Sequence, residues 1–243
     1  FGEYTYGRWY TIKGQRPSDE TGTYRYKFDA PKSWAGQRVK IFFDGVMTDA
    51  EIMINGKPAG EMHQGGFYRF NYDITELLNL GKKNQLEVKV AKESANRSIN
   101  AAERKADWWL FGGIYRPVWL EVLPQVHMEH FVLNADHHGK LQTAVDMAGD
   151  AKGHEIIVSV RSLKDGKTVY TSNGQTTITH PINNSDKEQM ISGEWASIIP
   201  WSTENPNLYV AKLELKNPEG KIVQTRETRI GFRTVEFFPQ DGV

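Results

Sequence analysis

The chain has 243 residues, enough for one large domain or two ordinary ones at roughly 150 residues each. Thirty basic and thirty acidic side chains give a formal net charge of zero, and no basic stripe is present that would neutralise a phosphate backbone, which argues against a nucleic-acid partner. The absence of cysteine excludes disulfides, thiol nucleophiles and thiolate metal sites, and no apolar run approaches the roughly 20 residues that span a bilayer.

The first half of the chain shows mainly strand patterns. Residues 21–30 alternate aromatic and polar side chains, as a half-buried strand does. Asn55-Gly56, between two strand-like runs, is a strong hairpin signal. Asp73 can cap a single helical turn that Gly81 ends, and this turn is the one helical piece that the pattern indicates clearly. Two further strands place alternate residues inward: Val39, Ile41 and Phe43 in one, Leu86, Val88 and Val90 in the other.

The second half repeats this β pattern after a break. The strand that follows Pro117 stops at Pro124, and a new set of strands begins near Val126. Hairpins are expected through Asp165-Gly166 and through residues 217–220, and the first follows a strand with Ile156, Val158 and Val160 on one face. The expected strands are too many for a single sandwich of about 100 residues. We therefore predict an all-β chain of two domains, 1–124 and 125–243.

Recognisable catalytic motifs are missing from the sequence. It contains no G-x-S-x-G elbow, no phosphate-binding G-x-x-x-x-G-K-[ST] loop and no H-E-x-x-H zinc motif. His137-His138 lie side by side in a predicted turn, where neighbours rarely converge on one metal, so we expect a solvated turn. No pair of acids stands out as general acid and nucleophile. We therefore predict that this chain lacks a complete active site.

The segment DWWLFGGIYRP, residues 107–117, has an unusual composition. In a strand Trp108 and Trp109 point to opposite faces, so one can fill the core while the other faces a ligand or another domain. Gly112-Gly113 permits a bend, and Asp107 at its mouth can accept hydrogen bonds from two hydroxyls. On the residues alone, packing remains an alternative to a ligand role. Arg116 is expected to form a buried ion pair or to bind backbone.

Five segments in order resemble glycoside hydrolase family 2: IFFDGVMTDAEIMINGKPAGE, FNYDITELLNLGKKNQLEVKV, ADWWLFGGIYRPVWLE, PWSTENPNLYVAKLEL and IGFRTVEF. The third is similar to β-galactosidase-like members from Bacteroidetes. The resemblance implies a galactose-binding-like jelly-roll β-sandwich, then an immunoglobulin-like β-sandwich, then a TIM barrel with two catalytic glutamates. Gly231-Phe232-Arg233 matches a motif that precedes the barrel, and the chain has no Asn-Glu dipeptide. We therefore expect a fragment that contains no catalytic residue.

The resemblance also implies roles for single residues. In β-galactosidases of this family the aspartate before the G-I-[FY]-R segment reaches the barrel's active site, where it binds substrate hydroxyls and helps to hold a sodium ion. The matching position is Asp107, and Trp109 matches a family aromatic in the same segment. We therefore expect Asp107 and Trp109 to bind substrate, with Asp107 as a possible sodium ligand shared with the barrel. No cofactor is expected in this chain, although the full-length enzyme can use sodium or magnesium.

The expected function is that of the N-terminal part of a β-galactosidase-like exo-glycosidase, inactive alone. The alternatives are a stand-alone carbohydrate-binding module, the corresponding part of a β-glucuronidase or β-mannosidase, and a purely structural role in scaffold and oligomer contacts. Expected partners are a carbohydrate with a terminal β-linked sugar, the barrel, and further copies in a homo-oligomer. The chain shows no signal-peptide pattern, and its Bacteroidetes-like character suggests a bacterial periplasmic or secreted protein.

Overall fold

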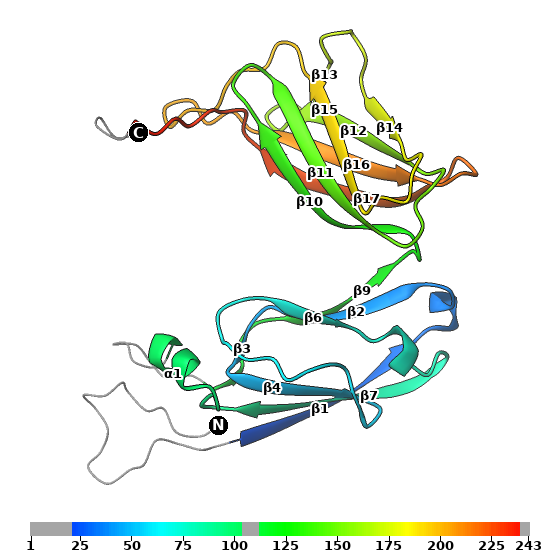
Figure 1. Cartoon of the computed structure of the whole chain (residues 1–243), viewed down its shortest axis with the longest axis vertical. Coiled ribbons are helices and arrows are strands. Elements are labelled where there is room, and N and C mark those ends of the chain that lie inside the picture. The colour runs from blue at the N-terminus through cyan, green and yellow to red at the C-terminus, as the bar shows by residue number, and fades with distance from the viewer. Residues whose placement is uncertain (1–20, 104–111, 239–243) are drawn as a thin grey trace. The chain divides into compact units, whose positions relative to one another are not determined.

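The computed structural model describes residues 21–103 and 112–238. The chain is nearly all β, which confirms the predicted fold class, and it divides into two compact units, Phe1–Leu123 and Pro124–Val243 (Figure 1). Each unit is described by itself below.

Unit 1 is a sandwich of two main sheets, seen as opposing layers in Figure 1. One sheet has the strand order β1-β7-β4-β5, the other β6-β2-β9, and β3 pairs with β8 beside them. All of these pairings are antiparallel. The strands are β1 (Thr21–Ala30), β2 (Arg38–Phe43), β3 (Val46–Met47), β4 (Asp49–Ile54), β5 (Lys57–Pro58), β6 (Phe70–Asp73), β7 (Lys82–Ala91), β8 (Gly113–Ile114) and β9 (Val118–Leu123).

The core of unit 1 lies between these sheets and contains the side chains that the alternation predicted. Val39, Ile41 and Phe43 of β2 face Leu86, Val88 and Val90 of β7, and all six are buried. In β1, Tyr24 and Phe28 pack against this core as expected. Asn55 and Gly56 have positive φ angles and connect β4 to β5, which confirms the predicted hairpin.

Within the described part of unit 1, three short helices interrupt the strands: η1 (Lys32–Trp34), η2 (Thr75–Leu77) and α1 (Arg97–Glu103). The turn η2 lies within the stretch where a helical turn was predicted, but its cap residue is Ile74 rather than Asp73 and it ends at Leu77, before Gly81. An Asp73 carboxylate oxygen accepts from the Thr75 amide at 3.0 Å. The helix α1 was not predicted. The Asn96 side chain accepts from the Ser98 amide at 3.0 Å and so caps its first turn.

Unit 2 is a second sandwich with its own core. One sheet has the order β10-β11-β15; in the other, β13-β12-β16-β17, β14 also pairs with β12. Ile156, Val158 and Val160 of β12 are buried in the core, as predicted. The turns at residues 165–166 and 217–220 connect β12 to β13 and β16 to β17. The strands are β10 (His127–Ala135), β11 (Lys140–Ala148), β12 (Glu155–Ser162), β13 (Thr168–Val169), β14 (Ile178–Pro181), β15 (Glu188–Glu194), β16 (Tyr209–Lys216) and β17 (Ile222–Ile230).

Candidate functional site

The two residues predicted to bind substrate, Asp107 and Trp109, lie outside the described residues, as does Trp108. Their predicted roles, including the sodium role of Asp107, therefore stay predictions. The structure does describe both flanks of their segment, which are Glu103 at the end of α1 and Gly112 before β8. The geometry around these flanks defines the candidate site.

A loop of residues 60–68, here called the Gly66 loop, lies beside these flanks. It follows β5 and is hydrogen-bonded to β4, because His63 and Ala50 exchange backbone hydrogen bonds of 3.0 and 2.8 Å. The Tyr68 hydroxyl donates to the Gln64 carbonyl at 2.6 Å, and the Tyr72 hydroxyl donates to the Glu61 carbonyl. These bonds hold an irregular stretch of backbone in one conformation.

On each side of the predicted site segment one residue is bonded to Gly66: Glu103 before it and Tyr115 after it. The Gly66 amide donates to a Glu103 carboxylate oxygen at 2.8 Å, and the Tyr115 hydroxyl donates to the Gly66 carbonyl. Gly66 is buried, so these two bonds satisfy backbone groups that are shielded from water. One residue before the 104–111 segment and one residue after it are therefore bonded to the same glycine.

A second set of bonds supports α1. Asp49 is 5% exposed, and its Oδ2 accepts from the Ala95 amide at 2.8 Å and from Gln64 Nε2 at 3.1 Å. The Asn100 side chain accepts from the Ser94 amide at 2.9 Å and donates to the Ser94 carbonyl at 2.6 Å. A buried carboxylate at the start of β4 thus connects the Gly66 loop to the chain that leads into α1.

His63 is the titratable group of the Gly66 loop with a perturbed pKa. Its ring stacks on Phe70 with centroids 3.6 Å apart, and its Nε2 donates to the Gly65 carbonyl at 3.0 Å. Burial lowers the pKa of His63 and outweighs the raising effects of the Gly65 carbonyl, Glu103 and Asp49. The imidazole is therefore biased toward its neutral form and acts as a packing and hydrogen-bonding group.

The glycine bend predicted in the DWWLFGGIYRP segment is present in its described part. Gly113 has φ +88° and is the first residue of β8, where it pairs with Met47 of β3. The expectation for Arg116 was wrong, because this side chain is exposed and its guanidinium lies 5.3 Å from the Tyr115 ring centroid. Its position just after a two-residue strand leaves it at the surface, where a cation–π contact replaces the expected buried partner.

The rest of the described chain contains no evident metal site. No group of three or more His, Asp or Glu side chains in residues 21–103 and 112–238 is arranged to hold a metal ion. His137 and His138 are exposed, with ring centroids 3.7 Å apart, and His137 Nδ1 lies 2.6 Å from Thr234 Oγ1. In the part of the chain that the structure describes, no helix is long and apolar enough to cross a membrane.

Comparison with known proteins matches both units to one family. Residues 3–124 match the model of the glycosyl hydrolases family 2 sugar binding domain, and residues 126–233 match a second model described as glycosyl hydrolases family 2. The chain belongs to glycosyl hydrolase family 2. This membership confirms the predicted family and explains the order of the two sandwiches.

Family 2 relatives are much longer than this chain. A β-galactosidase from Thermoanaerobacter pseudethanolicus is 29% identical over 218 residues, which cover 88% of this chain and 28% of the relative. A putative β-glucuronidase from Formosa agariphila is 30% identical over 223 residues, which cover 91% of this chain and 20% of the relative. The chain thus spans less than a third of the length of these two relatives.

Solved structures show the same fold. A glycosyl hydrolase family 2 member from Bacteroides cellulosilyticus superposes with a TM-score of 0.72 at 22% identity, covering 91% of this chain and 30% of the other. At that identity the likeness establishes the fold alone. It spans both sandwiches, which agrees with the family assignment.

Sequence reasoning missed the Gly66 loop and Glu103. The stretch H-Q-G-G-F-Y has no simple period, and Glu103 reaches Gly66 across 37 residues of sequence. One signal was present, since adjacent glycines next to an aromatic pair indicate close backbone approach. Nothing in the sequence indicated that Glu103 and Tyr115 would bind the backbone of Gly66.

Proposed function

We propose that this chain is the non-catalytic N-terminal part of a retaining exo-glycosidase, in which unit 1 shapes the rim of an active site carried by a following barrel. Two barrel carboxylates about 5–5.5 Å apart would cleave a terminal β-glycosidic bond with retention. Asp107 would accept hydrogen bonds from substrate hydroxyls, with Trp109 beside it, and Asp107 would help to hold a sodium ion.

The observation that best supports this role is the attachment of both segment flanks to Gly66. A rim residue must be held on a rigid base if its carboxylate is to meet a substrate at a fixed distance. Glu103 and Tyr115 supply such a base, because each bonds to a backbone group of a buried glycine.

The tryptophans within the described ranges offer no stacking platform for a stand-alone binding module, so that alternative would depend on a tryptophan outside these ranges, such as Trp109. A module that stacks sugar rings needs an exposed aromatic face. Trp34, Trp119, Trp195 and Trp201 are the tryptophans within the described ranges, and none of them is largely exposed. Trp119 lies against Phe42 with centroids 4.2 Å apart, and the Arg69 guanidinium lies 5.5 Å from its ring.

The proposed sugar is a terminal β-galactoside, because three of the five most similar curated relatives that we compared are named β-galactosidases. A β-glucuronide is the second candidate, since two putative β-glucuronidases match at 30% identity. We propose a periplasmic or secreted location for the bacterial parent enzyme.

Two measurements on the 243-residue chain test this proposal. Incubation with nitrophenyl-β-galactoside should give no release of nitrophenol, because the catalytic carboxylates belong to the barrel. Titration with galactose, followed by tryptophan fluorescence, should give no saturable change below millimolar concentrations. Turnover free of contaminating enzyme would contradict the non-catalytic role. Micromolar binding that weakens on Trp109→Ala would instead establish a stand-alone module.

A further inference from the structure

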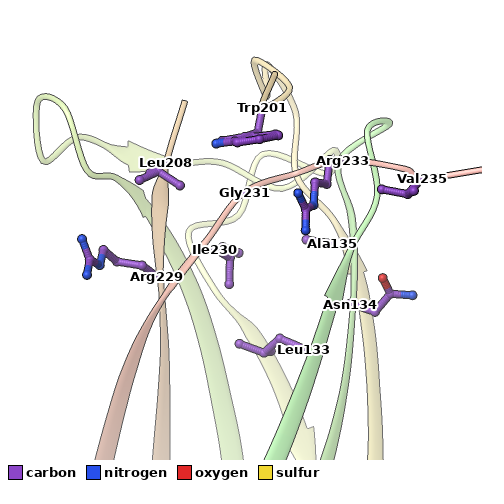
Figure 2. A pocket seen from close by; sticks show the side chains of 10 residues that line it. All are labelled: Leu133, Asn134, Ala135, Trp201, Leu208, Arg229, Ile230, Gly231, Arg233 and Val235. Atoms are coloured by element: carbon purple, nitrogen blue, oxygen red, sulfur yellow. The ribbon is translucent and has the colours of Figure 1, made fainter. Parts of the chain in front are cut away.

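Unit 2 contains a cavity of about 630 Å³ beside the end of β17 (Figure 2). We call it the Trp201 pocket; its lining includes Trp201, Arg229, Arg233, Asn134, Leu133 and Ile230. This volume lies within the range of roughly 300–1,000 Å³ that small-molecule sites occupy. Nothing in the proposed role of unit 1 uses this pocket.

The Gly231-Phe232-Arg233 motif builds one wall of the pocket. After β17 ends at Ile230 the chain runs between Trp201 and Ala135, with the Trp201 amide donating to the Phe232 carbonyl at 2.9 Å and the Arg233 amide to the Ala135 carbonyl at 3.0 Å. Phe232 is 0% exposed and packs edge-on against Tyr209. Because side chains alternate along an extended chain, burial of Phe232 turns residues 231 and 233 to the opposite side.

Trp201 and Arg233 meet over the glycine of this motif. A Cβ added to Gly231 would lie 3.1 Å from the Trp201 Cβ and 3.2 Å from its Cγ, so a larger residue here would require the ring to shift by a few tenths of an ångström. The Arg233 guanidinium lies over the same ring, 5.0 Å from the centroid. The indole and the backbone therefore hold a cationic group at the mouth of the pocket.

The charge of the pocket is unbalanced. Figure 2 shows Arg229 and Arg233 on opposite sides of Ile230. Among the described residues that line the pocket none is acidic, and neither arginine forms an ion pair within the described ranges. Leu133 and Ile230 pack against the core of unit 2 and supply an apolar floor. The pocket thus combines two arginines with a small apolar patch formed by Leu133 and Ile230.

We propose that the Trp201 pocket binds an amphipathic organic anion, a carboxylate carried on an apolar ring or chain. A guanidinium matches a carboxylate with two parallel hydrogen bonds, and the Asn134 amide can add a third donor. The apolar body would rest on Leu133 and Ile230. A metal cation is disfavoured by the two arginines, and a neutral sugar would leave hydroxyls unpaired against the apolar floor.

The test is calorimetric titration of the 243-residue chain with three probes: phenylbutyrate, phenylbutanol and acetate. Phenylbutyrate should bind with a Kd of about 1 mM or tighter at low salt. Phenylbutanol lacks the charge and acetate lacks the apolar body, so each should bind at least about tenfold more weakly. High salt should weaken phenylbutyrate binding, because it screens the arginines.

Variants assign the binding to this pocket. Arg233→Gln should weaken phenylbutyrate binding by about tenfold or more. Arg233→Lys should weaken it by less, because lysine keeps the positive charge but lacks the planar guanidinium. Lys221→Gln is the matched control, since it removes a cation at the other end of the β16–β17 hairpin, and it should leave the Kd unchanged.

Three outcomes would overturn the proposal: no binding of phenylbutyrate, equal binding of phenylbutanol, or equal losses in Arg233→Gln and Lys221→Gln. Thermal unfolding of each variant shows whether it is folded. If Arg233→Gln does not fold, the phenylbutyrate affinity of Arg233→Lys tests the proposal instead. Failure here would leave the proposed role of unit 1 untouched, because that role rests on different residues.

Discussion

Removing the Glu103 carboxylate should affect the candidate site most directly. It accepts a hydrogen bond from the buried Gly66 amide, and an unsatisfied buried donor costs about 1–3 kcal/mol. We expect Glu103→Ala to lower the free energy of unfolding of unit 1 by that amount, measured by urea denaturation. Glu103→Gln keeps an acceptor oxygen and should lose less.

The control for this prediction is Glu188→Ala, which removes an exposed carboxylate from unit 2. It should change stability by less than about 0.5 kcal/mol. Equal losses in Glu103→Ala and Glu188→Ala would show that the bond to Gly66 does not stabilise unit 1.

The lowered pKa of His63 predicts how the stability of unit 1 depends on pH. Its pKa is lowered in the folded state, so below its ordinary value of 6.5 the unfolded chain binds more protons than the folded one. This contribution to stability is present above pH 6.5 and is lost as the pH falls through the folded pKa. We expect the Tm of unit 1 to decrease from pH 7.5 to pH 5.5.

The variant His63→Phe separates this effect from other titrations. It keeps an aromatic ring on Phe70 but has no group to protonate, so the decrease in Tm over the same pH range should be smaller than in the unmodified chain. Identical pH dependence in the two proteins would contradict the assignment to His63.

At the scale of elements, α1 determines where Glu103 lies. The Asn96 side chain caps this helix, and replacing such a cap by alanine costs about 1 kcal/mol. We expect Asn96→Ala to increase amide hydrogen exchange in residues 97–103, with no change in unit 2. Asn96→Asp retains the acceptor and should show the exchange of the unmodified chain; equal exchange in both variants would exclude a capping role.

The strands were predictable from the sequence, whereas α1 was not. Apolar residues at every second position, such as Leu86, Val88 and Val90, indicate a strand with one buried face. A helix of seven residues shows too few turns for a clear period, and α1 is stabilised from outside through Asn100 and Ser94. The Asn55-Gly56 hairpin was predictable because these two residues readily adopt the positive φ angles that the turn requires.

The candidate site was predictable only in part. The resemblance to family 2 pointed to Asp107, which lies outside the described residues, so its role is still a prediction. The contacts around Gly66 depend on pairs that are distant in sequence, such as Tyr115 with Gly66, which are 49 residues apart. Such pairs leave no local pattern in the sequence.

At the scale of the whole molecule, two separate hydrophobic cores divide the roles of the chain. The core around Val88 supports the Gly66 loop, and the core around Leu213 supports the Trp201 pocket. The proposed rim and the proposed anion pocket therefore belong to different folding units. Changes to one should leave the binding properties of the other intact.

The central claim is that Asp107 contributes to a glycosidase active site, and the kinetics of the full-length parent enzyme test it most directly. Asp107→Asn should lower kcat/KM for nitrophenyl-β-galactoside by about 10–100-fold, the range expected when charge-assisted hydrogen bonds to hydroxyls are weakened, with Tm unchanged. Asp29→Asn, which alters an exposed carboxylate of the same unit, should leave kcat/KM unchanged. An Asp107→Asn enzyme that is folded and retains full kcat/KM would contradict the account and leave unit 1 a scaffold.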